Sequence, residues 1–399
     1  MISSLLGLDA LFSFYVKILC NILHEGIKMS SVVKSSLENP NYKILKNLLP
    51  KNEQKTPPKP NDNIPFGSIA TNHMLICDYD PQKNGWQVPE ITKFKSFSVC
   101  PSAVVFHYGQ TIFEGLKAYQ SLSNQNEVFL FRPDQNAKRM TRSATRLSMI
   151  PFPEDLFVNC IKELVKAEKD WILPPPGALY IRPSLISLDK GISYRASETY
   201  RFFIIASPAK SYFTNETGVS VYIERNFSRA ALGGAGEAKC GGNYAAALPS
   251  LNDAKEKGAE QVLWLDAFEH RYVEEAGAMN VMFVYNQKII TPMLTGSILH
   301  GVTRASVIEL AKYLGYEVEE KRIEINQIIE DAKNGKLTEM FACGTAVVIS
   351  PVHTMLDGEQ KISINNCQTG SVTMHLKNEL IGIQTGTKPD PFGWRCPIF

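Results

Sequence analysis

Residues 231–249 read ALGGAGEAKCGGNYAAALP, the densest cluster of small residues in the chain, with Lys239 standing among the glycines. Glycine lets the backbone approach a ligand closely. A lysine held on such a segment can bring its amine to a carbonyl carbon, which is the geometry of a Schiff base. An ordinary glycine-rich turn with a solvated lysine is the simpler interpretation of this stretch alone. A dinucleotide fingerprint is excluded, because Lys239 occupies the third glycine position of G-x-G-x-x-G counted from Gly234.

Three further segments offer groups that could bind a phosphate. Residues 296–306 (GSILHGVTRAS) run into a predicted helix, where the free amides of Val302 and Thr303 and the helix dipole favour an anion. Residues 341–346 (FACGTA) end a predicted strand on a Gly-Thr step, and Arg139 would supply a fixed charge. Taken one at a time, a helix cap, a strand-end turn and a surface arginine are the simpler interpretations.

Residues 273–280 (VEEAGAMN) place two carboxylates before a predicted strand. A carboxylate such as Glu275 could keep a pyridine nitrogen protonated, which makes the ring an electron sink. Glu274 could be the solvated neighbour, and the local pattern does not decide between the two.

Length and composition indicate a globular protein. The 399 residues predict two or three domains at about 150 residues each. The chain has 42 Lys and Arg residues and 40 Asp and Glu residues, which gives a net charge of +2. This charge does not indicate nucleic-acid binding, which usually needs a basic patch and a high pI. The seven histidines lack ligand spacing and the eight cysteines contain no C-x-x-C pair, so we expect no metal site and reduced thiols.

Residues 1–23 form the most apolar run, but Asp9 and Lys17 interrupt it and the first arginine is Arg132. A membrane span needs about 20 residues with few charges, and a mitochondrial transit peptide is rich in arginine. We therefore give equal weight to two interpretations of this run: a targeting role, and an appended segment or an upstream start before Met29. We expect no membrane partner and a cytoplasmic protein, with a mitochondrial location as the alternative if this segment is a targeting signal.

The body of the chain alternates β-rich runs with helical patterns, which is typical of a mixed α/β protein. Phe157, Ile161, Leu164 and Val165 follow the spacing of a core-facing helix. Further helices are expected at 133–147, at 244–257 and from 302, and strands at 127–131, 179–186, 202–206, 261–265 and 280–285. The predicted domains are a poorly ordered extension and polar tether (1–65), a small domain (66–207), a linker (208–217) and a large domain (218–399).

Six segments, in this order, resemble those of branched-chain amino acid aminotransferases. They are HYGQTIFEGLKAY (107–119), FRPDQNAKRM (131–140), LYIRP (179–183), KCGGNYAAAL (239–248), EEAGAMN (274–280) and GTAVVISPV (344–352). The resemblance spans residues 66–394. It implies fold type IV of the pyridoxal phosphate enzymes, which is the D-amino acid aminotransferase-like fold. Such a protein has a smaller N-terminal α/β domain, a larger C-terminal domain with a β-barrel-like sheet, the cofactor between them, and a homodimer.

The resemblance also implies roles for individual residues. Lys239 matches the lysine that holds pyridoxal 5'-phosphate as an internal aldimine and shuttles the proton. Tyr244 matches the partner of the ring hydroxyl, and Glu275 the partner of the pyridine nitrogen. The remaining cofactor contacts match Arg139, Leu299, Gly301, Val302, Thr303 and Thr345. The substrate-binding positions match Tyr108, Phe113, Tyr180, Arg182, Tyr212, Ala278, Thr345 and Ala346.

The implied activity is a reversible ping-pong transfer of the amino group of leucine, isoleucine or valine to 2-oxoglutarate, which gives the branched 2-oxo acid and L-glutamate. The chain departs from the family at a few positions. Val347 and Ser350 stand where some animal members carry a C-x-x-C pair, and Pro249 is expected to kink the helix after Tyr244. A D-amino acid aminotransferase or an aminodeoxychorismate lyase of the same fold is the near alternative. A non-catalytic binding or regulatory relative is the alternative from another class.

Overall fold

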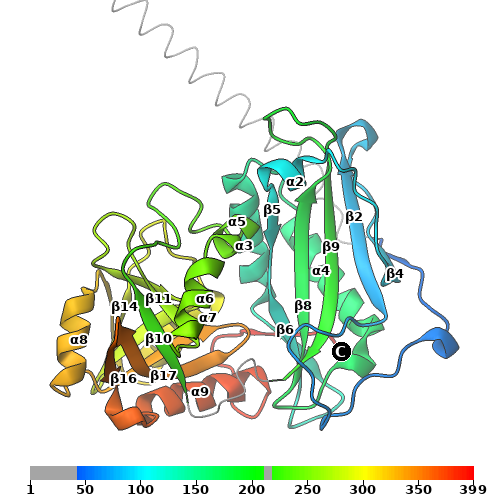
Figure 1. The fold of residues 1–399 in the computed structure, drawn as a ribbon. Coiled ribbons are helices and arrows are strands. Elements are labelled where there is room, and N and C mark those ends of the chain that lie inside the picture. The colour runs from blue at the N-terminus through cyan, green and yellow to red at the C-terminus, as the bar shows by residue number, and fades with distance from the viewer. Residues whose placement is uncertain (1–42, 211–217) are drawn as a thin grey trace, which may run out of the picture. The chain divides into compact units, whose positions relative to one another are not determined.

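The computed structural model describes residues 43–210 and 218–399, which form two β-sheets with helices packed against them (Figure 1). This architecture confirms the predicted mixed α/β class. Residues 1–42 and 211–217 lie outside the described residues, and with them lie the predicted substrate residue Tyr212 and the apolar run at 1–23. None of the described helices has the length and apolar character that a membrane span requires.

The first sheet has ten strands, and its long central strands β8 and β9 pair from Ala178↔Ala209 to Ser187↔Tyr200. Two short strands lie off the main path: β3 (Gly85–Trp86) pairs with β2, and β5 (Thr111–Phe113) pairs with β8. The strand order is β1 (Leu45–Lys46), β4 (Glu90–Lys93), β2 (His73–Asp80), β9 (Tyr200–Ala209), β8 (Ala178–Ser187), β6 (Leu116–Gln120), β7 (Val128–Phe131) and β19 (Arg395–Pro397).

Helices α3 (Pro133–Arg146) and α4 (Glu154–Ala167) pack against each other, and α4 also packs on β2. The predicted core-facing helix is confirmed, because Phe157, Ile161, Leu164 and Val165 are all buried on α4. A short helix, α2 (Val104–Tyr108), precedes β5. The 3-10 helices of the described chain are η1 (Lys51–Glu53), η2 (Pro81–Lys83), η3 (Lys169–Trp171) and η4 (Asn365–Cys367).

The second sheet has nine strands and contains the apolar core of the C-terminal half. Strand β18 (Gln360–Ser363) pairs with β17 beside the main path. The strand order is β12 (Val273–Ala276), β11 (Gln261–Leu265), β10 (Val219–Glu224), β17 (Val348–Asp357), β16 (Glu339–Gly344), β13 (Asn280–Tyr285), β14 (Lys288–Pro292) and β15 (Glu317–Lys321).

Helices α7 (Val302–Tyr313), α8 (Ile325–Lys333) and α9 (Ser371–Gln384) follow in the second half. The predicted stripe on α7 is buried at Val307, Leu310 and Ala311, and it packs with residues of α9 in one cluster. Gly315 follows the helix with φ 88°, a left-handed conformation that glycine adopts at little cost.

The helix expected over 244–257 is divided into α5 (Gly241–Ala245) and α6 (Leu248–Glu256). Pro249 lies in the first turn of α6. Proline has no N–H, and inside a helix its ring would clash with the carbonyl four residues earlier, so it is favoured in the first turn of a new helix over the interior of a continuous one. The division is stronger than the kink that the sequence predicts.

The solvated tether expected through residue 65 differs from the structure from residue 43 onward. Strand β1 pairs in parallel with β4, the Leu49 amide donates to Nε2 of His73 at 2.9 Å, and the Lys55 amide donates to Asn72 at 2.8 Å. These backbone bonds to distant residues, which polar composition does not reveal, tie the segment to the first sheet. Residues Ile44–Phe399 accordingly form one compact unit.

The last strand returns to the first sheet. Strand β19 pairs with β7 through Arg395↔Phe131 and Pro397↔Phe129, although the predicted large domain extends to residue 399. Apart from β19, the strands of the first sheet end with Ala209 of β9, and those of the second sheet begin with Val219 of β10. The domain boundaries at 207 and 218 stay a prediction.

Replacing Glu168 with alanine should destabilise the first sheet strongly. The buried Glu168 carboxylate accepts hydrogen bonds from the His73 amide (2.7 Å), the Asn72 amide (3.3 Å) and Nδ1 of His73. The substitution leaves three buried donors without an acceptor, and we expect a loss of about 3 kcal/mol or more in the free energy of unfolding, measured by urea denaturation.

Glu163→Ala is the matched control, on helix α4, for which Glu168 is the C-cap residue. Its carboxylate pairs with Lys46 and Lys166 near the surface, so we expect a loss of under about 1 kcal/mol. Equal losses for the two variants would contradict the importance of the buried acceptor.

Candidate active site

Lys239 lies just before α5, and its backbone is fixed at both ends. Its amide donates to Oγ of Ser143 on α3 at 2.9 Å, and its carbonyl accepts from the Phe113 amide at 3.0 Å. Its amine donates to the Tyr244 hydroxyl at 2.7 Å. The glycine-rich stretch is therefore not a turn with a solvated lysine, because the half-buried amine is held by a specific partner.

Aromatic rings and an arginine surround the Lys239 amine. Nζ lies 4.8 Å from the Phe113 ring centre and 5.2 Å from the Tyr244 ring centre. The Arg182 guanidinium lies 4.7 Å from the Phe113 ring centre and donates to the Tyr180 hydroxyl at 2.9 Å. The structure thus brings these five predicted site residues into one cluster.

Gly115 makes room for the Tyr180 side chain. A Cβ atom at this glycine would lie 2.1 Å from the Tyr180 hydroxyl oxygen, a distance that no side chain tolerates. Glycine at position 115, between β5 and β6, is therefore required for the position of Tyr180.

Arg139 projects from α3 and is not a surface arginine. Its guanidinium forms a two-pronged pair with Glu114, from Nε at 2.7 Å and from Nη2 at 2.8 Å, and its Nη1 donates to the His300 carbonyl at 3.1 Å. Burial raises the pKa of Glu114, but the Arg139 guanidinium outweighs this effect and holds that pKa below its ordinary value. Arg139 keeps two further N–H donors beside the start of α7.

Helix α7 begins at Gly301, and no side chain caps its first amides. A Cβ atom at Gly301 would lie 2.0 Å from Oδ1 of Asn280, so only glycine lets the helix start this close to β13. The uncapped amides of Val302 and Thr303 and the helix dipole are suited to an anion.

Glu275 on β12 is a buried carboxylate with three polar neighbours. Its Oε1 accepts from the Leu299 amide at 2.9 Å and from Asn280 at 3.3 Å, and its Oε2 lies 2.8 Å from Nε of Arg229. Burial raises the pKa of Glu275, while the Arg229 charge lowers it, and burial prevails. The charges of Lys239 and Arg139 also act on this carboxylate.

Glu274 is not the solvated neighbour that the sequence allowed. Its side chain is buried, with Oε1 accepting from the Ser297 hydroxyl. Burial raises the pKa of Glu274 to about 7. The alternation of a strand puts the two carboxylates on opposite faces of β12, and both faces are covered.

The turn at 345–347 joins β16 to β17 and carries the predicted residues Thr345 and Ala346. The Lys117 amine reaches it from the first sheet and donates to the Ala346 carbonyl at 2.7 Å. Val348, the next residue, has φ 62°.

Two predicted substrate residues make no hydrogen bond, ion pair or ring contact with the described residues of this cluster. Ala278 is exposed in the turn between β12 and β13. Tyr108 is 39% exposed, donates its hydroxyl hydrogen to the Ile192 carbonyl and packs on the Tyr194 ring at 5.3 Å. Their roles in the substrate pocket stay predictions.

Sequence reasoning missed Glu114, Lys117, Arg229, Asn280 and Ser297, which hold the predicted residues in place. Glu114 and Lys117 carried a signal, since each is a charge within the apolar run IFEGLKAY (112–119). Arg229 and Ser297 carried none, because the carboxylates that they contact are distant in the chain, whereas Asn280 lies in the same segment as its partner Glu275.

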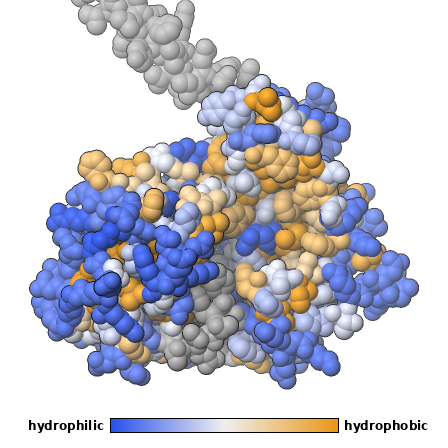
Figure 2. All heavy atoms as spheres, viewed as in Figure 1, coloured by the Kyte–Doolittle hydropathy of each residue, from blue (hydrophilic) through white to orange (hydrophobic). Residues whose placement is uncertain are grey.

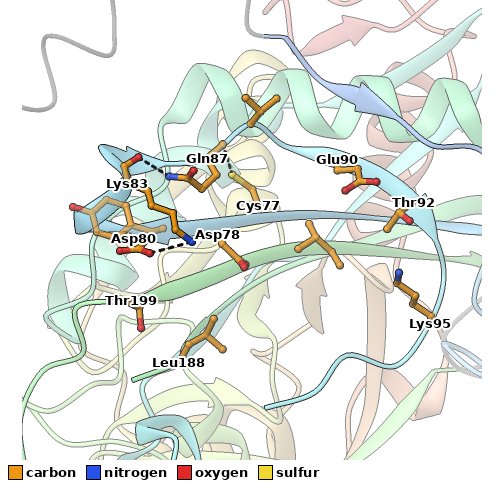
Figure 3. A pocket seen from close by; sticks show the side chains of 13 residues that line it. Cys77, Asp78, Asp80, Lys83, Gln87, Glu90, Thr92, Lys95, Leu188 and Thr199 are labelled. Carbon is orange, nitrogen blue, oxygen red and sulfur yellow. Dashed lines mark hydrogen bonds and ion pairs between the residues drawn. The ribbon is translucent and has the colours of Figure 1, made fainter. Parts of the chain in front are cut away.

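A groove along β2 and β4 lies apart from this cluster (Figure 3). It has a volume of about 380 Å³ and contains none of the predicted site residues. Several of its polar groups pair with one another: Lys83 with Asp80 at 3.5 Å, and Gln87 with the Lys83 carbonyl at 2.9 Å. Among the described residues, no group of three His, Cys, Asp or Glu side chains is arranged to hold a metal ion.

Comparisons with known proteins agree on one family. A family model described as amino-transferase class IV matches residues 111–355. The branched-chain-amino-acid aminotransferase 2 of Bacillus subtilis (strain 168) is 45% identical over 344 residues, which cover 86% of this chain and 94% of the relative.

Two solved structures extend this agreement to the fold. The Escherichia coli branched-chain amino acid aminotransferase has a TM-score of 0.68 at 26% identity, with 78% of this chain and 97% of that chain covered. The T.th. branched-chain amino acid aminotransferase, complexed with N-(5'-phosphopyridoxyl)-L-glutamate, has a TM-score of 0.66 at 28% identity, covering 82% and 98%.

Glu274→Gln should reduce the pH dependence of stability. Because folding raises the pKa of Glu274 from 4.5 to about 7, the native state holds the proton more tightly, and stability falls as the pH rises through this window. Glutamine is neutral throughout, so the variant should gain on the order of 2–3 kcal/mol relative to the parent between pH 4 and pH 8. Urea unfolding at both pH values measures the difference.

The exposed Glu330→Gln is the control and should follow the parent at both pH values. An unchanged pH dependence in Glu274→Gln would contradict the raised pKa.

Proposed function

Because the chain belongs to the branched-chain-amino-acid aminotransferase family within the class IV aminotransferases, we propose that it transfers the amino group of leucine, isoleucine or valine to 2-oxoglutarate. The products are the branched 2-oxo acid and L-glutamate, and the two substrates use one pocket in turn. The proposal rests on the Lys239 amine, which donates a hydrogen bond to the Tyr244 hydroxyl and lies in the cluster formed with Phe113, Tyr180 and Arg182.

Class IV aminotransferases use pyridoxal phosphate, and the donor set of this site fits it. The chain provides a lysine amine, a tyrosine hydroxyl, a buried carboxylate and a phosphate cradle. Lys239 and Tyr244 would hold the aldehyde end and the ring hydroxyl, and Glu275 would face the ring nitrogen. Bound pyridoxal phosphate supplies an aldehyde that carries the amino group and a ring that draws electrons from the substrate Cα.

Arg139 and the start of α7 would hold the phosphate. Glu114 and the His300 carbonyl fix the Arg139 guanidinium with two N–H donors to spare. The amides at 302 and 303 add the field of the helix dipole. Further contacts in this proposal come from Leu299, Gly301 and the Thr345 hydroxyl.

Lys239 would move the proton in the reaction. Its Nζ would take the proton from the Cα of the amino acid and pass it to carbon C4′ of the cofactor in the same half-reaction, and in the second half-reaction it would move a proton from C4′ to the Cα derived from the 2-oxo acid. The Tyr244 hydroxyl orients this amine by accepting its hydrogen bond at 2.7 Å. The Phe113 ring, 4.8 Å from Nζ, excludes water from one side of it.

Glu275 would keep a proton at the ring nitrogen. Burial raises its pKa, so the carboxyl readily shares a proton with a basic partner. Arg229 and the Leu299 amide limit that rise and fix the orientation of the carboxylate. A carboxylate held in this way favours the protonated, electron-drawing form of the ring.

One pocket must accept both an isobutyl side chain and the charged side chain of glutamate. Phe113 and Tyr180 provide apolar walls, and Nε of Arg182 is buried with no hydrogen-bond partner among the described residues. This guanidinium can pair with the distal carboxylate of glutamate and stay stacked on Phe113 when leucine is bound. The remaining members of the proposed pocket are Tyr108, Tyr212, Ala278, Thr345 and Ala346.

A second copy of this chain is the proposed partner. Figure 2 shows apolar side chains gathered over the part of the surface where Figure 1 labels α2, β8 and β9. The exposed apolar residues near α2 include Phe106 (63% exposed), Ile192 (71%) and Tyr194 (89%). Exposed apolar residues gathered in this way are typical of a protein interface.

Bacterial relatives support a cytoplasmic location, and none of those reported above supports the mitochondrial alternative.

Lys239→Ala should abolish transamination between leucine and 2-oxoglutarate, because no other amine replaces the one beside Tyr244. After treatment with pyridoxal phosphate and borohydride, intact-mass analysis should show one covalently attached cofactor on the parent and none on the variant. Lys257→Ala, which removes a surface lysine paired with Tyr222, should behave as the parent. Retained turnover in Lys239→Ala would overturn the proposed function.

Arg182→Met should separate the two substrate classes. The substitution removes the charge for the distal carboxylate and preserves apolar bulk, so kcat/KM for glutamate should fall roughly tenfold more than kcat/KM for leucine. Arg225→Met, at an exposed pair with Asp357, is the control. An equal loss for both amino acids would show that Arg182 does not recognise the distal carboxylate.

A further inference from the structure

Lys117 is a buried charge to which the proposed reaction gives no role. It lies on β6, is 7% exposed, and pairs across the first sheet with Tyr180 on β8. Its neighbours in the chain do have roles: Phe113 faces the Lys239 amine, Glu114 fixes Arg139, and Gly115 makes room for Tyr180.

The Lys117 amine links the first sheet to the turn at 345–347. Its one hydrogen bond among the described residues goes to the Ala346 carbonyl at 2.7 Å, across 229 positions of sequence. This is a charge-assisted bond from a buried donor, so it fixes the carbonyl more firmly than a neutral donor would.

The turn needs such support, because Val348 follows it at φ 62°. A β-branched residue in the left-handed region is strained, and such a conformation persists only where surrounding contacts impose it. Val348 pairs with Gly344 at the start of β17, and Lys117 adds a contact from the first sheet to the turn between these two residues.

No carboxylate pairs with Lys117 within the described part of the chain. Glu114, on the preceding segment, has both carboxylate oxygens occupied by Arg139 and Asn136. Burial lowers the pKa of Lys117 to about 8, so its amine still carries a charge at neutral pH. A buried charge without a counter-charge is costly, and an anionic substrate beside it would offset that cost.

We propose that Lys117 is a positioning residue of the substrate site: it holds the turn at 345–347 through the Ala346 carbonyl and provides positive charge beside the place where a substrate carboxylate binds. This inference rests on the proposed function, since it assumes that Thr345 and Ala346 line the substrate pocket. It predicts an effect on carboxylate binding that is separate from cofactor binding and from proton transfer.

Lys117→Met tests the inference, because methionine keeps the length and apolar stem and removes both the charge and the donor. We expect the cofactor to bind with parental stoichiometry and kcat to stay within roughly threefold. KM for leucine and the dissociation constant for 4-methylpentanoate, which has the leucine skeleton without its amino group, should each rise roughly tenfold. Calorimetry measures the binding of this unreactive carboxylate independently of turnover.

Lys117→Arg should restore both constants to near the parental values, and Lys257→Met is the matched control that should change neither. If Lys117→Met does not fold, Lys117→Gln decides, since it keeps a donor and lacks the charge. The inference is overturned if the folded uncharged variant binds 4-methylpentanoate with parental affinity. It is also overturned if that variant no longer binds the cofactor. A parent enzyme that neither transaminates leucine nor binds 4-methylpentanoate would instead overturn the proposed function.

Discussion

The buried ion pair between Glu114 and Arg139 is the interaction on which the site depends. Two charges taken out of water cost several kcal/mol each unless their geometry and hydrogen bonds compensate. Here both carboxylate oxygens are occupied, at 2.7 and 2.8 Å by Arg139 and at 2.8 Å by Asn136. Because the pair fixes α3 against β5 and carries Arg139 to the His300 carbonyl at 3.1 Å, it also sets where helix α7 begins.

Local charges, and not the net charge of +2, provide the electrostatics of this protein. Three cations each donate to a different acceptor: Arg139 to the His300 carbonyl, Arg182 to the Tyr180 hydroxyl and Lys117 to the Ala346 carbonyl. The Glu275 carboxylate is held between Arg229 and the Leu299 amide. Buried charges act strongly at short range because little water screens them. A nearly neutral chain can therefore provide separate sites for a phosphate, a ring nitrogen and a carboxylate.

The sequence was most informative where function requires a particular residue at a particular spacing. The resemblance of the six segments predicted the family and fold type IV, and the apolar spacing predicted the helix that carries Phe157 and Ile161; all three are confirmed. Local pattern failed where the deciding contact is distant. Neither the pairing of β1 with β4 nor that of Arg229 with Glu275 leaves a signal in neighbouring residues. The local pattern left the exposure of Glu274 open, because exposure depends on what packs above a strand.

The return of β19 to β7 has a consequence for the order in which the chain can fold. The two strands are more than 260 residues apart, and Trp394 closes the edge by packing on Phe131 at 5.5 Å. During synthesis β7 therefore stays an open strand edge until residues 395–397 have been made, which is after all the strands of the second sheet. Open edges recruit other strands, and distant pairings form slowly. This edge of the first sheet is thus open to other strands throughout the interval between the synthesis of β7 and that of β19.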